Sequence, residues 1–184
     1  MGGLSGMVMG SVSASVVSHA SCPVVVVRED NHVTDSTKYG PVVVGVDGSE
    51  VSQKATAYAF REAQARGAAL IAVHTWMDMQ VQASLAGLSA AQSEWADIEK
   101  EQSELLAENL KEPREEYPDV EVKQLITRDR PVSALTEAAE GAQLLVVGSH
   151  GRGGFKGMLL GSTSRALLQS APCPMMVVRP DEDN

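Results

Sequence analysis

A run of four apolar residues followed by a long glycine-rich loop constrains the fold of this chain more than any other feature. Leu144 to Val147 show no polar alternation, which is typical of a strand buried on both faces. The loop after them ends in Gly161, Ser162 and Thr163, a sequence typical of a helix start. Glycines let a backbone approach an anion closely, and the first amides of a helix are unpaired donors. The stretch therefore predicts a strand, loop and helix that hold phosphate.

Two common phosphate loops do not fit this spacing. A P-loop that began at Gly148 would need Lys after Gly153, but Gly154 stands there. A dinucleotide-binding loop is much shorter and follows the first strand of its unit. A plain corner between a strand and a helix takes about 2 to 6 residues, so the length of this loop favours a ligand over a simple turn.

The beginning of the chain repeats part of its end. Residues 2–28 align without a gap on residues 153–179, and thirteen of the twenty-seven pairs are identical, including Gly10 with Gly161 and Cys22 with Cys173. The partners of Gly148 and Gly151 in this alignment would lie before Met1. We therefore expect the first copy to lack its half of the site, and one site per chain.

The repeat predicts the domain organisation. Residues 1–28 read as the last helix and strand of a first domain, residues 29–39 as a polar linker, residues 40–180 as one complete domain and residues 181–184 as a tail. An isolated helix and strand cannot stand alone in water, so we expect residues 1–28 to dock on a sheet edge, either in this chain or in a second one. Because both cysteines hold one equivalent position, we interpret them as buried thiols without a disulfide.

Strand and helix patterns alternate through the complete domain. Apolar runs predict strands at 41–46, 70–76, 120–127, 144–147 and 175–178, and helices are predicted at 51–66, 89–111, 132–140 and 162–170. Ser49 and Gly67 are the expected caps of the first helix, and Pro113 and Pro118 are expected to end the second. The pattern predicts an α/β fold, a doubly wound five-stranded parallel sheet with helices on both faces.

In a sheet with strand order 3-2-1-4-5, ligands bind beyond the carboxyl ends of the first and fourth strands, where the winding reverses. Asp47 follows the first strand and Gly148 ends the fourth. Two features found independently in the sequence are therefore expected at one crevice.

These motifs resemble the universal stress protein family, and in particular its ATP-binding members. The resemblance is carried by Val44 to Ser49, by Val73 to Thr75, by the spacing from Gly148 through Gly151 to Gly161 and Ser162, and by Ala171 to Pro174. It covers essentially the whole chain. It implies ATP and Mg²⁺ as cofactors and a homodimer through pairing of last strands, with Val24 to Val27 antiparallel to Met175 to Val178.

The resemblance also implies a set of site residues. Asp47, with Gly45 and Val46 before it, is expected to contact the adenosine, and Thr75 to line the adenine pocket. Glycines and hydroxyl residues of the loop are expected to bind the ribose and phosphates: Gly148, Gly151, Gly161, Ser162 and Thr163. Arg152 and Lys156 are expected either to neutralise phosphate charge or to face solvent. His74 is expected to have a structural role, and His150 to face ribose or solvent. No metal ligands or catalytic residues are predicted.

Charge and hydropathy limit the partners. The net charge is −9, and residues 94–121 carry eleven acidic against three basic residues, which disfavours nucleic acid and anionic lipid. No apolar run reaches the roughly 18 residues of a membrane span, and no basic residue precedes Arg28 as a signal peptide would require. We expect a cytoplasmic protein that binds no nucleic acid and no membrane.

Three functions remain open at this point. The leading hypothesis is an ATP-binding regulatory module in stress adaptation, with slow or no hydrolysis because no group for phosphoryl transfer stands out. The second is a scaffold of the same fold that does not use nucleotide and dimerises through edge strands. The third is an adenylate-handling hydrolase or transferase, for which residues 77–88 are the obvious place for a second substrate.

Overall fold

The computed structural model describes residues 10–28, 31, 39–76, 92–151 and 159–180, and the side chains of residues 92–96 lie outside that description. The strands within it are β1 (Val24–Val26), β2 (Val42–Gly45), β3 (Leu70–Thr75), β4 (Val122–Thr127), β5 (Leu144–Gly148) and β6 (Met175–Val178). The helices are α1 (Ser11–His19), α2 (Glu50–Arg66), α4 (Gln92–Glu116), α5 (Pro131–Ala138) and α6 (Ser162–Ser170). Strands and helices alternate from β2 to β6, as predicted.

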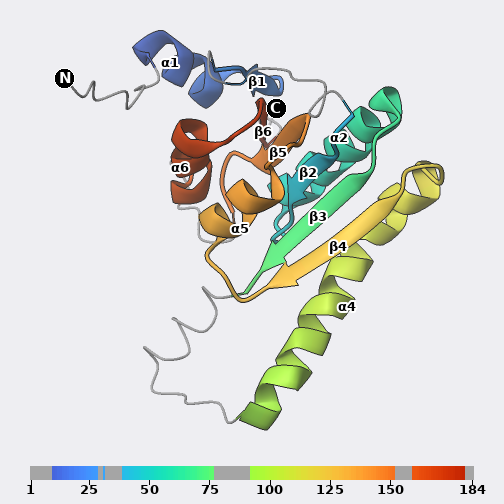
Figure 1. Ribbon diagram of the computed structural model, residues 1–184. Coiled ribbons are helices and arrows are strands. Elements are labelled where there is room, and N and C mark those ends of the chain that lie inside the picture. Colours follow the sequence, from blue (N-terminus) through green and yellow to red (C-terminus); the bar gives the residue numbers. More distant parts are fainter. Residues whose placement is uncertain (1–9, 29–30, 32–38, 77–91, 152–158, 181–184) are drawn as a thin grey trace.

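The strands form one twisted sheet in the order β1-β6-β5-β2-β3-β4 (Figure 1). From β4 to β6 all pairs are parallel, and these five strands have the predicted 3-2-1-4-5 order of the complete domain. The sheet has six strands rather than five, because β1 adds antiparallel to the edge of β6. The expected doubly wound α/β fold is confirmed, with one strand more at its edge.

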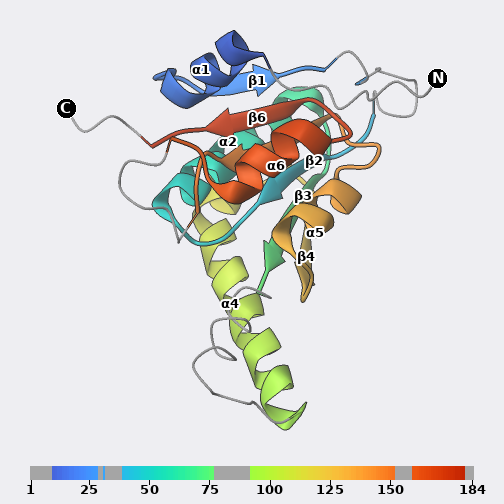
Figure 2. The ribbon, with the colours of Figure 1, turned by 90° about the vertical axis from the view of Figure 1, so that its left-hand side faces the viewer.

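Helices cover both faces of the sheet, and a separate aliphatic core lies under each layer (Figures 1 and 2). On one face α1, α5 and α6 bury Val17, Leu135 and Leu167 against the strands. On the other face α2 and α4 bury Phe60 and Leu106. The inner strands have apolar residues toward both cores, which is why the sequence runs that encode them do not alternate.

Local sequence signals set the ends of α2 and α5 as expected. The side chain of Ser49 accepts a hydrogen bond from the amide of Ser52 and caps α2, while Gly67 ends that helix with a left-handed φ of 59°. Pro131 is at the first position of α5. An amide at this position makes no hydrogen bond within the helix, so proline costs no helical bond there.

The prediction that Pro113 ends the second helix is wrong. α4 continues through Pro113 to Glu116, and the amide of Tyr117 still donates to the carbonyl of Pro113 at 2.9 Å. A proline inside a helix removes only its own hydrogen bond and strains the turn before it. The last turn keeps its other bonds, and Pro118 follows the actual end of the helix. Leu106 and Leu110 of this helix are fully buried, and the side chain of Trp95 lies outside the described residues.

Residues 10–28 dock within this chain. β1 pairs with β6 in the register Val24↔Val177, Val25↔Met176 and Val26↔Met175, which is the expected antiparallel orientation. The prediction that both cysteines are buried is wrong for Cys22, which is exposed, and holds for Cys173. Cys173 is enclosed by the α5 and α6 core, whereas Cys22 lies at the sheet edge, beyond that core. Neither cysteine forms a disulfide.

Candidate functional site at the carboxyl edge of the sheet

The carboxyl ends of β2 and β5 lie side by side at the centre of the sheet. The two strands pair in parallel with Val42 opposite Leu144 and Val44 opposite Val146. β2 therefore delivers Asp47 and β5 delivers Gly148 to the same edge. In the sheet, β3 and then β4 lie on one side of β2, while β5 and then β6 lie on its other side, so this is the point where the winding reverses.

Asp47 is fixed by the turn that leads into α2. Its Oδ1 atom accepts one hydrogen bond from the amide of Ser49 at 2.9 Å and another from the Ser49 hydroxyl at 2.6 Å. Its own amide donates to the Oγ atom of Ser52 at 3.0 Å. Because three bonds hold this residue, its half-buried carboxylate has one defined orientation at the strand end.

Gly151 passes directly over that carboxylate. A β-carbon built on Gly151 would stand 2.2 Å from Oδ2 of Asp47, far inside any real contact distance. Gly148 is also restricted, since a β-carbon there would meet the Val51 side chain at 3.0 Å. Only glycine lets the backbone at position 151 approach Asp47 this closely, whereas a side chain at position 148 would require Val51 to shift by a few tenths of an ångström.

The N-terminus of α6 is attached to the same strand end. The amide of Gly161 donates to the carbonyl of Ser149 at 2.7 Å. The hydroxyl of Ser164 donates to the carbonyl of Ser149 at 2.7 Å and lies 3.0 Å from that of Gly148. These bonds hold the first turn of α6 beside β5. The N-cap residue Gly161 has no side chain to cap that turn. Among the described residues its amides and the helix dipole therefore remain available to an anion.

The remaining loop residues differ in exposure. Ser162 is exposed and Thr163 is half-buried, whereas Ser164 of the same turn is buried. His150 is also half-buried, and its Nδ1 atom lies 3.0 Å from the hydroxyl of Ser149. Arg152 and Lys156 lie outside the described residues.

Thr75 ends β3 on the other side of β2 and is half-buried. It lies opposite Thr127 of β4. On its other side β3 pairs with β2, where Val73 lies opposite Gly45.

Gly45 ends β2, and a β-carbon there would contact the Leu135 side chain at 3.2 Å. Val46, 3% exposed, follows with its amide bonded to the carbonyl of Val73 at 2.8 Å. The structure thus gathers Gly45, Val46, Asp47, Gly148, Gly151 and the start of α6, with Thr75 one strand away.

His74 supports this edge from inside the protein. It is 1% exposed, and its Nδ1 atom lies 2.6 Å from the carbonyl oxygen of Val46. Its Nε2 atom lies 3.0 Å from the side chain of Gln102 on α4. The expected structural role of His74 is confirmed, because both ring nitrogens have partners and neither reaches solvent.

Sequence reasoning missed Gln102, Ser149 and Ser164 as supporting residues. All three residues are buried: the Gln102 side chain contacts His74, the Ser164 hydroxyl holds the start of α6, and the backbone carbonyl of Ser149 accepts its hydrogen bond. Ser164 had a usable signal, because Ser13 occupies the equivalent position of the internal repeat. Gln102 had none, since its partner is distant in sequence and only the packing of α4 brings them together.

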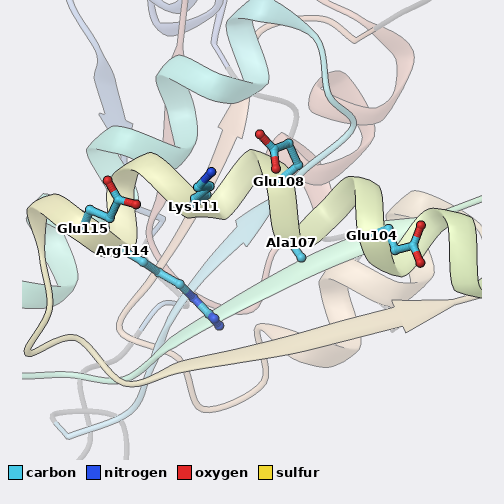
Figure 3. Close-up of a pocket in the computed structure, with 6 residues that line it drawn as sticks. All are labelled: Glu104, Ala107, Glu108, Lys111, Arg114 and Glu115. Carbon is cyan, nitrogen blue, oxygen red and sulfur yellow. The ribbon is translucent and has the colours of Figure 1, made fainter.

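A shallow depression on α4 lies away from this edge (Figure 3). Its lining is charged and includes Glu104, Glu108 and Lys111 on the outer side of the helix. Within it the guanidinium of Arg114 extends toward β4, 3.4 Å from the carbonyl of Val122. The depression shares no residue with the glycine-rich edge, so we assign it no part in the site.

No helix among the described residues is long and apolar enough to cross a membrane. Over the same residues, no group of three or more His, Cys, Asp or Glu side chains forms a place for a metal ion. Among the described residues, this edge offers backbone amides, hydroxyls and the Asp47 carboxylate, groups that suit recognition of an anion with a polar organic group attached.

Comparison with known sequences gives a consistent result. A model of the universal stress protein family matches residues 1–28 and 38–179. Universal stress protein Rv2005c of Mycobacterium tuberculosis is 47% identical over 178 residues, which cover 97% of this chain and 58% of that protein. Universal stress protein Rv1996 of the same organism is 46% identical over 182 residues, covering 99% and 57%. The chain thus spans somewhat more than half the length of these relatives.

Solved structures share the fold. A universal stress protein in complex with cAMP has a TM-score of 0.52 and 27% identity, covering 76% of this chain and 96% of its own. The universal stress protein from Archaeoglobus fulgidus in complex with dAMP has a TM-score of 0.55 and 23% identity, covering 76% and 98%. A second Archaeoglobus fulgidus universal stress protein covers 96% of this chain but 56% of its own, with a TM-score of 0.60 and 25% identity.

Proposed function

The chain belongs to the universal stress protein family, and on that premise we propose that it binds ATP with Mg²⁺ at the carboxyl edge of its sheet. The bound nucleotide makes it a cytoplasmic regulatory module in stress adaptation, with slow or no hydrolysis. The observation that carries the proposal is the meeting of the fixed Asp47 carboxylate, the glycine backbone at Gly151 and the uncapped start of α6 at one strand switch.

Each part of a nucleotide has a counterpart at this edge. The Asp47 carboxylate is an acceptor for the hydroxyl or amino donors of adenosine, next to the backbone of Gly45 and Val46, and Thr75 borders the adenine. The phosphates bind to the backbone at Gly148 and Gly151 and to the first turn of α6. In that turn Gly161, Ser162 and Thr163 offer amides and hydroxyls. Arg152 belongs to the same proposal as a phosphate partner.

The Mg²⁺ ion in this proposal is held chiefly by the phosphates. Mg²⁺ keeps several of its waters and commonly uses one or two protein ligands beside the phosphate oxygens. The donor set at this edge fits that mode, because the hydroxyl of Ser162 is exposed at the start of α6. Bound to the nucleotide, the ion would neutralise part of the phosphate charge.

Related structures support an adenine nucleotide as the ligand. Solved universal stress proteins carry cAMP in one case and dAMP in another, both adenine nucleotides. The choice of ATP rests on the resemblance of the spacing from Gly148 through Gly151 to Gly161 and Ser162 to the pattern of the ATP-binding members of the family.

The test is native mass spectrometry of the purified chain without added nucleotide, followed by calorimetric titration with Mg·ATP. We expect one adenine nucleotide per chain, and its loss in Gly161→Val. A β-carbon at 161 already meets the Cα atom of His150 at 3.2 Å, so valine would push the loop from the helix start. No bound nucleotide in the mass spectrum together with no binding on titration would favour the alternative function, a scaffold of the same fold that does not use nucleotide.

Gly10→Val is the matched control. Gly10 is the repeat equivalent of Gly161 and precedes α1 in a similar conformation, with φ −57° and ψ 152° against φ −69° and ψ 163°. Nothing lies within 4 Å of a β-carbon at Gly10. The control therefore adds the same side chain at an equivalent helix start without touching the site, and nucleotide binding should be retained.

A further inference from the structure

A row of buried polar groups connects α4 with the end of β2. Gln102 on α4 is 2% exposed and His74 on β3 is 1% exposed. The Oε1 atom of Gln102 lies 3.0 Å from Nε2 of His74, and Nδ1 of the same ring lies 2.6 Å from the carbonyl oxygen of Val46. Val46 immediately precedes Asp47 in the chain. The row therefore begins on a helix that covers the sheet and ends one peptide bond from Asp47, whose carboxylate belongs to the proposed site.

The peptide unit between Val46 and Asp47 is held by side chains at both of its polar groups. Its carbonyl oxygen faces His74, and its amide donates to Oγ of Ser52 on α2 at 3.0 Å. A carbonyl oxygen only accepts, so Nδ1 of His74 carries a hydrogen and donates it. Because a peptide unit is planar, these two bonds fix its orientation and with it the direction in which Asp47 leaves β2.

Gln102 is the polar member of an otherwise apolar contact. Among the described side chains of α4, the buried ones are Gln102, Leu106 and Leu110, spaced four residues apart on one side of the helix. The N-terminal part of α4 projects beyond the sheet (Figures 1 and 2), and its side chains from 97 to 101 are exposed or half-buried. Gln102 thus lies where the projecting part of α4 meets the domain.

An amide at position 102 satisfies the ring of His74. It has both an oxygen and an NH₂ group, so it can accept a hydrogen bond from Nε2 or donate one to it, and in either case Nδ1 remains bonded to Val46. Leucine at this position would leave Nε2 without a partner in the core, where an unpaired polar atom is costly. The ring would then lose the bond that keeps it turned toward Val46.

We propose that His74 is a positioning residue of the nucleotide site and that Gln102 couples this site to α4. The proposal rests on the proposed binding of ATP at Asp47. A shift of α4 that moves Gln102 loosens the ring and the turn that carries Asp47, and so lowers the affinity for ATP. Because coupling between two sites is reciprocal, bound ATP in turn stabilises the packing of α4 around Gln102. α4 is then the element through which the state of the site reaches the protein surface.

Hydrogen exchange in the chain without nucleotide tests the row by itself. Gln102→Leu should speed exchange of the amides of Val46, Asp47 and Ser49, each of which is hydrogen-bonded at this turn, by about tenfold. Asn109→Leu is the matched control, because Asn109 is a half-buried amide residue of the same helix whose side chain donates to a carbonyl of that helix at 2.7 Å. Equal exchange rates at the turn in the two variants would overturn the coupling.

Two changes at His74 separate positioning from stability. His74→Asn keeps an amide donor near the place of Nδ1, whereas His74→Leu removes it. In calorimetric titration, ATP affinity should fall by about tenfold or more in His74→Leu and stay within about threefold of the natural value in His74→Asn. Leu70→Ala is the control for lost stability, because Leu70 is fully buried at the opposite end of β3, and it should bind like the natural chain.

Two results of this titration would overturn the positioning role. One is equal affinity of His74→Leu and Leu70→Ala. The other is a loss of affinity in His74→Asn as large as in His74→Leu, since the donor to Val46 would then not matter. If His74→Leu does not fold, as judged by circular dichroism, the titration of His74→Asn and the exchange of Gln102→Leu still decide the question.

Exchange of α4 with and without Mg·ATP tests the reciprocal effect. In the natural chain ATP should slow exchange of the amides around Gln102, and this slowing should be lost in Gln102→Leu and kept in Asn109→Leu. ATP that binds the natural chain without slowing α4 would overturn the coupling. A natural chain that binds no ATP would instead contradict the proposed function, and exchange at the Asp47 turn would still decide whether α4 acts on this edge.

Discussion

The backbone of Gly151 lies against the carboxylate of Asp47, so closely that a β-carbon on the glycine would stand 2.2 Å from Oδ2. The two residues come from loops more than a hundred positions apart, after β2 and after β5. Their contact joins the two halves of the proposed nucleotide site, which makes it the most direct point at which to test that site.

Replacing Gly151 by alanine should weaken ATP binding by about tenfold or more, equivalent to about 1.4 kcal/mol. The new methyl group must displace Asp47 or the loop, and Asp47 cannot yield freely because Ser49 holds it through two hydrogen bonds. Calorimetric titration measures the change. Gly10→Ala, where a β-carbon meets nothing within 4 Å, should bind like the natural chain. An unchanged affinity for Gly151→Ala would separate this contact from nucleotide binding.

Replacing Asp47 by asparagine should also weaken ATP binding, by about tenfold. The amide keeps an oxygen acceptor for the bonds from Ser49, so the turn before α2 is preserved, but the charge that strengthens hydrogen bonds from adenosine is lost. The same titration with Asp119→Asn serves as control, because Asp119 is exposed and precedes β4 at the opposite edge of the sheet. Equal effects of the two changes would mean that only net charge matters.

Replacing Gln102 by leucine should lower the free energy of unfolding by about 1 to 3 kcal/mol. The change leaves the buried Nε2 atom of His74 without its partner on α4. Urea denaturation followed by circular dichroism gives the value. Gln64→Leu, on the exposed side of α2, should change stability far less. A loss as small as that of the control would show that water replaces Gln102 beside His74.

The two thiols should differ in reactivity. Cys22 is exposed, whereas burial raises the pKa of the Cys173 thiol to about 11. At pH 8 we expect an aromatic disulfide reagent to modify one thiol per folded chain rapidly and the second only after unfolding. Cys22→Ser should abolish the rapid phase. Rapid modification in that variant would contradict the burial of Cys173.

The same pKa shift predicts the effect of alkaline pH on stability. The neutral thiol is favoured in the folded state, so its contribution is complete below the ordinary thiol pKa of 9.0 and is lost as pH rises toward about 11. Thermal unfolding of the natural chain and of Cys173→Ala, measured from pH 8 to pH 11, should show the steeper decline in the natural chain. Parallel declines would assign the effect to other groups.

Turnover provides a further measurement. With Mg·ATP we expect phosphate release well below the roughly 1 to 100 per second typical of kinases, because no described residue is placed to orient a water or acceptor. A malachite green assay over hours is sufficient. Turnover within the kinase range, absent from Gly161→Val, would require a catalytic role for this edge.

The order of strands and helices could be predicted from the sequence, because each signal for them is local. The apolar runs of β2, β3 and β5, the cap at Ser49 and the glycine at position 67 act over a few residues, and they predicted these elements closely. The repeat of residues 2–28 predicted a strand at β1, and the resemblance to the universal stress protein family predicted that it pairs antiparallel with β6.

The polar side chains that support the proposed site could be recognised only from the packing of the whole domain. Gln102 reaches His74, and the Ser164 hydroxyl reaches the carbonyls of Gly148 and Ser149, through contacts set by how whole helices pack on the sheet. The exposure of Cys22 and the passage of α4 through Pro113 were decided in the same way. Burial depends on what covers a residue from elsewhere in the chain, and that neighbour is not encoded in the local sequence.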